Sequence, residues 1–125
     1  MRIRSLKLPE VREVGSHFAY SCSSLSDLRL SRLEKSGSYF ATFCRALVTL
    51  ELPELEKVGH SFAYWCPSII SLGLPKLETT GGYFAYKCSS LTDLSLPELK
   101  EAGFSFAHGC PLLPKEAIPT CVSER

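Results

Sequence analysis

Residues 50–71 read LELPELEKVGHSFAYWCPSIIS, and related stretches of the same length fill the rest of the chain. The frame returns every 22 residues, without an insertion or deletion, at Gly15, Gly37, Gly59, Gly81 and Gly103, at Phe18, Phe40, Phe62, Phe84 and Phe106, and at Cys22, Cys44, Cys66, Cys88 and Cys110. A fixed period of this size is typical of repeat architectures, in which each unit buries its apolar residues only against its neighbours. The sequence therefore predicts a solenoid of stacked units.

Each unit combines two apolar periodicities. Leu28 and Leu30 are separated by one variable residue, which predicts a short half-buried strand. The proline that follows in most units ends the strand, because it has no N–H to donate. Farther along the unit, Phe18, Cys22 and Leu25 have the spacing of a short helical turn with one face inward. The repeat glycine before this turn is expected at a corner with a positive φ angle.

These elements predict about six short parallel strands on one face and short helical or irregular turns on the other. The strands are expected near residues 6–8, 28–30, 50–52, 72–74, 94–96 and 116–118, with the five repeat phenylalanines buried. Glu116 replaces a repeat leucine, so the last strand is expected to be frayed or absent. Residues 1–125 are interpreted as one domain of five units with partial units at both ends.

The N-terminal edge of the predicted sheet carries no polar substitution of this kind. Terminal units of a solenoid need a polar outer face. Either Met1 therefore begins a piece cut from a longer array, or a partner covers this edge, in which case a homo-oligomer could form through it.

Residues 52–69, LPELEKVGHSFAYWCPSI, resemble the BspA-like class of leucine-rich repeats in their spacing of leucine–proline, glycine and cysteine. The resemblance covers residues 3 to about 121. The chain departs from the class in having phenylalanine before alanine and a unit one residue shorter than usual. The resemblance implies a leucine-rich-repeat-like solenoid that binds ligands at the variable strand positions. It also implies an adhesive role, because members of the class are often surface or secreted proteins.

Composition excludes several function classes. The chain is 45% hydrophobic and 22% charged, and its formal net charge is +1 with both signs interleaved, so it has no electrostatic footprint for nucleic acid. No run approaches the roughly 20 apolar residues of a membrane-spanning helix, and the N-terminus lacks the apolar core of a signal peptide. These features and unpaired thiols favour a reducing intracellular environment, whereas the family resemblance favours the cell surface or secretion.

The cysteines and histidines do not form a predicted site. Five of the six cysteines stand 22 residues apart, without a Cys-x-x-Cys pair or a histidine at ligand spacing, so no metal is expected. They are interpreted as buried thiols that pack as small apolar groups, with Cys121 the most accessible. His17, His60 and His108 occupy three different repeat positions, and no catalytic triad or phosphate-binding glycine cluster is present. The sequence therefore predicts neither an enzyme nor a cofactor.

The variable strand positions form one candidate ligand-binding surface, called the strand face. It consists of Lys7, Asp27, Arg29, Thr49, Glu51, Ser71 and Asp93. The alternative is that these residues only solvate the sheet. A neighbouring column alternates in sign along the stack and is expected to set the register of the units: Glu10, Arg32, Glu54, Lys76 and Glu98.

A second candidate surface is aromatic. It consists of Tyr39, Phe43, Tyr64, Trp65, Tyr83 and Tyr86, none of which the repeat frame requires. Exposed aromatic clusters are typical of interaction surfaces, although these side chains could instead cover the core. The position of Phe43 and Trp65 is occupied by serine, lysine or glycine in other units, which predicts that the two rings form a partly exposed patch used for contact with another chain.

Two function classes follow. The first is a protein-interaction or adhesion scaffold that binds a protein ligand through the strand face or the aromatic surface. The second is a structural spacer that stacks end to end through its open edges. Selective retention of a partner favours the first, and concentration-dependent association alone favours the second.

Overall fold

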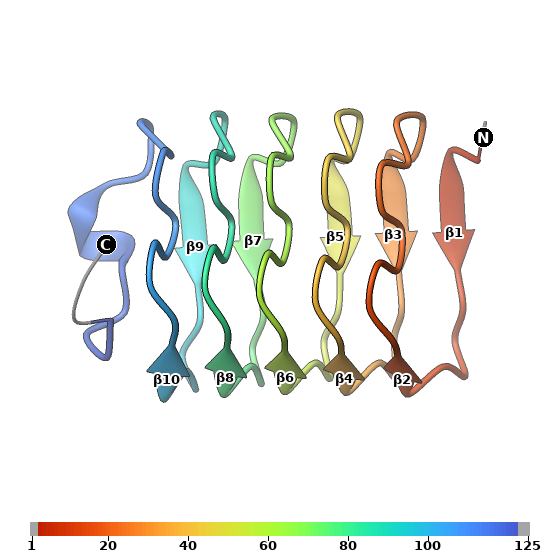
Figure 1. The fold of residues 1–125 in the computed structure, drawn as a ribbon, viewed down its shortest axis with the longest axis horizontal. Coiled ribbons are helices and arrows are strands. Elements are labelled where there is room, and N and C mark those ends of the chain that lie inside the picture. Colours follow the sequence, from red (N-terminus) through yellow and green to blue (C-terminus); the bar gives the residue numbers. More distant parts are fainter. Residues whose placement is uncertain (1–2, 123–125) are drawn as a thin grey trace.

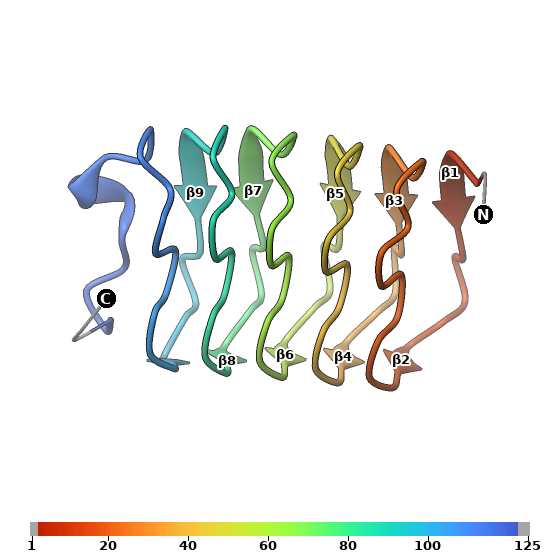
Figure 2. The ribbon, with the colours of Figure 1, turned by 45° about the horizontal axis from the view of Figure 1, so that its top comes forward.

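The computed structural model describes residues 3–122, and Met1, residue 2 and residues 123–125 lie outside the described part. The described chain winds into a solenoid whose units lie side by side along one axis (Figure 1). Three-residue strands form one side, and irregular segments run along the opposite side, as Figure 2 also shows. The predicted repeat solenoid is confirmed.

Two ladders of parallel strands join the units. The first contains β1 (Ser5–Lys7), β3 (Asp27–Arg29), β5 (Thr49–Glu51), β7 (Ser71–Gly73) and β9 (Asp93–Ser95). The second contains β2 (Glu13–Val14), β4 (Lys35–Ser36), β6 (Lys57–Val58), β8 (Thr79–Thr80) and β10 (Glu101–Ala102). Leu28 lies opposite Leu50, and Val14 lies opposite Ser36. Residues paired between neighbouring units are therefore 22 positions apart, which is the period of the sequence.

The first ladder differs from the prediction in its details. Its strands run one residue earlier than expected, both in the units with proline after the second leucine and in the unit with Ser31 at that position. Pairing is interrupted between β5 and β7, which divides the ladder into sheets of three and two strands. The sixth strand is absent, as expected from Glu116, and the 3-10 helix η1 (Lys115–Ala117) takes its place.

The second ladder was not predicted from the sequence, and it explains the repeat glycines. The prediction of a positive φ angle at these glycines is wrong, because among the described glycines only Gly109 has one. They are required by close packing between units instead. A Cβ atom added to Gly81 would lie 2.8 Å from the backbone nitrogen of His60 and 3.0 Å from the carbonyl carbon of Gly59.

The predicted helical turn is also wrong. Three alternate residues of the first unit, His17, Ala19 and Ser21, have left-handed φ angles of 68°, 59° and 55°, and the later units repeat the pattern. Alternation between left- and right-handed residues cannot continue as a helix. The segment is held between units, since the N–H of Phe43 donates to the carbonyl of Tyr64 at 2.8 Å.

The core lies between the strand side and the irregular segments. Four of the five repeat phenylalanines are buried, and Phe18 at the N-terminal end is partly buried, so this prediction is confirmed. Successive rings stack with centroid separations of 4.9 to 5.6 Å. The rigid stack fixes the spacing at which the side chains of the irregular segments repeat.

Candidate functional site

The strand face holds much of its charge in ion pairs. Arg29 lies 2.8 Å from the Asp27 carboxylate and 3.3 Å from the Glu51 carboxylate. The hydrogen bond with Asp27, strengthened by the charges of Asp27 and Glu51, raises the pKa of Arg29. These three predicted residues therefore meet, and the single positive charge of Arg29 is shared between two carboxylates.

The other predicted strand-face residues fall into two groups, one beside these ion pairs and one on a separate sheet. Lys7 stands level with Arg29 in β1, and Thr49 stands level with Asp27 in β5. Ser71 and Asp93 border a separate hollow of about 290 Å³ on β7 and β9, which the C-terminal segment partly encloses. Five of the seven strand-face residues are thus brought together on β1, β3 and β5, and Ser71 and Asp93 lie on the separate sheet of β7 and β9.

Two ion pairs form between neighbours in the column of alternating charges. Glu10 lies 3.4 Å from Arg32, and Lys76 lies 2.7 Å from Glu54. Both pairs join neighbouring units and are exposed, so solvent screens them and each stabilises the stack only weakly. Their position at the edge of the units agrees with a role in register.

The thiols belong to the core. Cys44, Cys66, Cys88 and Cys110 are buried, Cys22 is partly buried, and Cys121 is exposed, as predicted. No cluster of metal-ligating side chains occurs within residues 3–122. In the same part of the chain, no helix has the length and apolarity to span a membrane.

The aromatic surface is built from three columns of side chains on the irregular segments. Column A contains His17, Tyr39, Ser61, Tyr83 and Ser105; column B contains Tyr20, Thr42, Tyr64, Tyr86 and His108; column C contains Ser21, Phe43, Trp65, Lys87 and Gly109. Where aromatic residues are consecutive within columns A and B they stack, with centroids 4.9 Å apart for Tyr64 and Tyr86. Phe43 and Trp65 are 39% and 45% exposed, as the variety of column C predicts.

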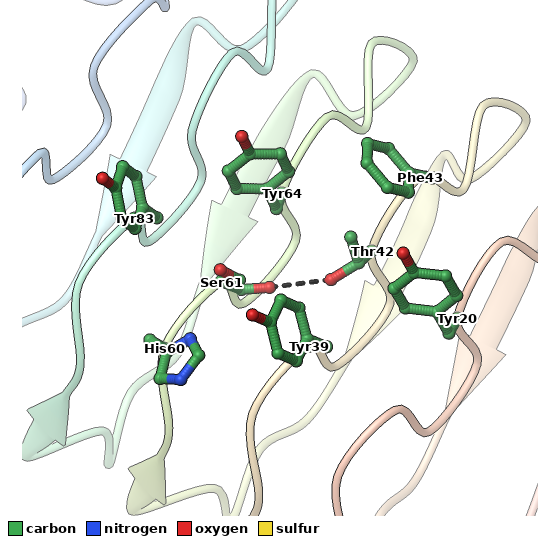
Figure 3. A pocket seen from close by; sticks show the side chains of 8 residues that line it. All are labelled: Tyr20, Tyr39, Thr42, Phe43, His60, Ser61, Tyr64 and Tyr83. Carbon is green, nitrogen blue, oxygen red and sulfur yellow. Dashed lines mark hydrogen bonds between the residues drawn. The ribbon is translucent and has the colours of Figure 1, made fainter.

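The columns leave a hollow where small residues interrupt two of them. Thr42 replaces a ring in column B, and Ser61 replaces a ring in column A one unit later. Both are buried and form the floor, where the Thr42 hydroxyl donates to the Ser61 carbonyl at 2.9 Å. The hollow has a volume of about 420 Å³ and is lined by Tyr20, Tyr39, Thr42, Phe43, His60, Ser61, Tyr64 and Tyr83 (Figure 3).

The rings around this floor meet edge to face. Phe43 makes such contacts with Tyr20 and Tyr64, each with centroids 5.7 Å apart. Further edge contacts join Tyr20 to Tyr39 and Tyr39 to His60. These contacts fix the ring orientations, so the rim is formed before any ligand binds.

Backbone conformation positions the rim. Tyr39, Phe43 and Ser61 all have left-handed φ angles, between 59° and 62°. A left-handed φ angle at a residue other than glycine costs about 1–3 kcal/mol where no surrounding contact stabilises it. Here the N–H of Tyr39 donates to the His60 carbonyl at 2.9 Å, and the N–H of Ser61 donates to the Gly82 carbonyl at 2.8 Å. Stacking between units therefore stabilises the conformation that presents the rings.

The lining of the hollow contains no carboxylate, lysine or arginine. Burial, followed by the influence of Tyr86, Tyr83 and Tyr39, raises the pKa of Tyr64, so its phenol stays neutral. Beside the hollow, the Lys87 ammonium lies 5.2 Å from the Trp65 ring centroid and 5.6 Å from that of Tyr86. The surface thus combines aromatic rings with a lysine ammonium that already lies over two of them.

The sequence predicted part of this site. Four predicted aromatic residues line the hollow: Tyr39, Phe43, Tyr64 and Tyr83. Trp65 and Tyr86 lie beside it, in contact with Phe43 and Tyr64 respectively. Tyr20, Thr42, His60 and Ser61 were missed as lining residues. The signal for the two floor residues was present in the sequence, because each interrupts a column that is otherwise mostly aromatic.

Comparison with solved structures defines the class of fold. A leucine-rich repeat protein from Bacteroides ovatus ATCC 8483 aligns with a TM-score of 0.64 and 17% identity over 98% of this chain. The T. pallidum leucine-rich repeat protein aligns with a TM-score of 0.52 and 21% identity over 90% of this chain and 79% of its own. The fold is therefore that of leucine-rich repeat proteins.

This chain spans 42% of the length of the Bacteroides protein. Its sequence matches no family model and no curated protein. The structural likeness therefore assigns the fold, and the similarity to the BspA-like class rests on the sequence frame alone.

Proposed function

We propose that the chain is a protein-interaction scaffold and that its contact surface is the aromatic surface. The observation that carries the proposal is a preformed, partly exposed set of rings around a hollow of about 420 Å³. Aromatic side chains that are rigid before binding lose little conformational entropy in a complex, and tyrosine and tryptophan are enriched in binding hot spots. The repeat frame itself requires none of these rings.

The strand face is the weaker candidate. Asp27, Arg29 and Glu51 are already paired with one another, so a charged ligand has to displace an existing partner. An adhesive role of the BspA-like kind is consistent with an aromatic contact surface, and it rests on the resemblance of the repeat frame.

Affinity capture with matched variants tests the proposal. The parent chain, an aromatic-surface variant (Phe43→Ser with Trp65→Ser) and a strand-face variant (Lys7→Ser with Asp93→Ser) are immobilised and exposed to proteins of the source cells. The parent and the strand-face variant are expected to retain the same partners, and the aromatic-surface variant is expected to lose them. Loss in the strand-face variant alone contradicts the proposal.

A second candidate function, end-to-end stacking, is favoured by the N-terminal face. An apolar hollow of about 200 Å³ there is lined by Ile3, Leu6, Phe18, Ala19, Cys22 and Leu25. A Cβ atom on Gly15 would meet nothing within 4 Å, whereas the later repeat glycines are packed against a preceding unit.

Sedimentation velocity across a concentration series tests this role. A mass that rises with concentration, and is restored to the monomer by Leu6→Glu, supports stacking, whereas a concentration-independent monomer contradicts it.

A further inference from the structure

The hollow above Thr42 and Ser61 has the geometry of an aromatic cage. Five tyrosine or phenylalanine rings and one histidine ring surround the floor in Figure 3: Tyr20, Tyr39, Phe43, Tyr64, Tyr83 and His60. Five contacts between neighbouring rings around the rim have interplanar angles of 71° to 87°. Rings turned at near right angles to their neighbours enclose a space from several directions, as a flat stack cannot.

The chemistry of the lining favours a positive ligand. Each tyrosine and phenylalanine ring carries negative charge density over its face, which attracts a cation within about 6 Å of the centroid. No lysine or arginine of the lining opposes a bound cation. The same surface already holds one, because the Lys87 ammonium lies over Trp65 and Tyr86 at 5.2 and 5.6 Å.

The absence of a carboxylate from the lining selects among cations. A lysine ammonium has three N–H donors and a guanidinium has five, and the lining offers them hydroxyl groups but no carboxylate, which is the acceptor that binds such charged donors most strongly. An alkylated ammonium has no such requirement and is weakly hydrated. The lining therefore suits an ammonium whose hydrogens are replaced by methyl groups.

We propose that this hollow binds the trimethylammonium group of a methylated lysine side chain on a partner protein. The inference rests on the proposed function, which supplies the protein partner. The surroundings support a side chain over a free small cation, because the exposed rings of Tyr20, Phe43 and Trp65 offer contact area around the hollow that only a flanking peptide can cover.

Calorimetric titration of the chain with three capped Gly-Xaa-Gly peptides tests the inference. The central residue is trimethyllysine, lysine, or the uncharged tert-butyl isostere of trimethyllysine. Trimethyllysine is expected to bind about 5- to 30-fold more tightly than the isostere, the range that corresponds to a cation–π contribution of about 1–2 kcal/mol. Equal binding of charged and uncharged peptides, or binding of neither, overturns the inference.

Matched variants locate the binding. Thr42→Tyr fills the hollow with the residue that column B carries in three other units, so the fold is expected to survive and binding to be lost. Ser61→Tyr does the same in column A and serves if the first variant fails to fold. Ser105→Tyr places the same side chain in column A away from the lining and is expected to bind as the parent does. Unchanged binding in a folded, filled variant overturns the site.

A further titration with tetramethylammonium distinguishes the two possible ligands, a free small cation and the side chain of a partner protein. Tighter binding of the peptide supports a protein ligand, and equal binding overturns the assignment to a partner side chain. Failure of every cation probe, together with partner capture that still depends on Phe43 and Trp65, rejects the cage and leaves the scaffold proposal standing.

Discussion

The Cys66 thiol donates a hydrogen bond to the carbonyl oxygen of Ala41, one unit earlier, with a sulfur–oxygen distance of 2.9 Å. The equivalent bonds join Cys44 to Ala19, Cys88 to Ala63 and Cys110 to Ala85 at 2.9 to 3.1 Å. Ala41 has a left-handed φ angle of 53°. The repeat cysteine and the repeat alanine therefore act together, because the thiol hydrogen bond holds the backbone segment that carries the aromatic columns.

Replacing Cys66 by alanine removes this donor and leaves a buried carbonyl without it. The variant Cys66→Ala is expected to lower the free energy of unfolding by about 1–3 kcal/mol, measured by urea denaturation. Cys121→Ala is the matched control, because Cys121 is exposed, and it is expected to change stability by about 0.5 kcal/mol or less. Equal effects of the two substitutions would mean that the thiol ladder is not structural.

Stability is expected to fall at alkaline pH. A hydrogen bond with Cys44 and burial raise the pKa of Cys66, and a hydrogen bond with Cys110 and burial raise that of Cys88. In the unfolded chain both thiols ionise at about pH 8.5. Their contribution to stability is therefore complete below that pH and is lost progressively as the pH rises above it.

Denaturation in urea between pH 7 and pH 10 measures this loss. The variant Cys88→Ala removes one of the two groups and is expected to show a shallower decline than the parent. A parent stability that stays constant across the alkaline range contradicts the account of the buried thiols.

The repeat glycines provide a test of packing between units. Gly81→Ala places a Cβ atom 2.8 Å from the backbone nitrogen of His60, which cannot move away as a flexible side chain would. We expect a loss of about 1–3 kcal/mol in thermal or chemical denaturation. Gly15→Ala, where nothing lies within 4 Å, is expected to cost about 0.5 kcal/mol or less. A comparable loss at both positions shows that the glycines act through backbone freedom instead.

Sequence predicted the solenoid and the core because both depend on periodicity. The positions of Phe40 and Leu50 recur in every unit, and stacked units bury identical positions together. The irregular segment was misread because its apolar spacing also fits a helical turn. The left-handed conformation of Ala41 depends on a hydrogen bond to Phe18 from the neighbouring unit, which no local pattern reveals.

The candidate site was only partly predictable for a related reason. Tyr39 and Tyr64 stand out as residues that the frame does not require, so composition alone identifies them. Thr42 and Ser61 are small residues that stand out in the sequence only when the repeats are aligned, and the hollow above them depends on how the columns lie in space. The pairing of Arg29 with Asp27 within the strand face also depends on side-chain geometry.

The aromatic patch is expected to be dispensable for folding. Phe43 and Trp65 are 39% and 45% exposed, so replacing both by serine removes limited burial and is expected to cost about 1–2 kcal/mol. Circular dichroism and thermal denaturation check this expectation. Outright unfolding of the double variant shows that the two rings are part of the outer wall of the solenoid and are not a contact patch.

The central claim is that the aromatic surface contacts partners, and hydroxyl-radical footprinting of the chain bound to a captured partner tests it most directly. Oxidation of Tyr64 and Trp65 is expected to fall on binding, while carbodiimide labelling of Asp93 and Glu51 on the strand face stays unchanged. Protection of the strand face with undiminished oxidation of the two rings contradicts the account.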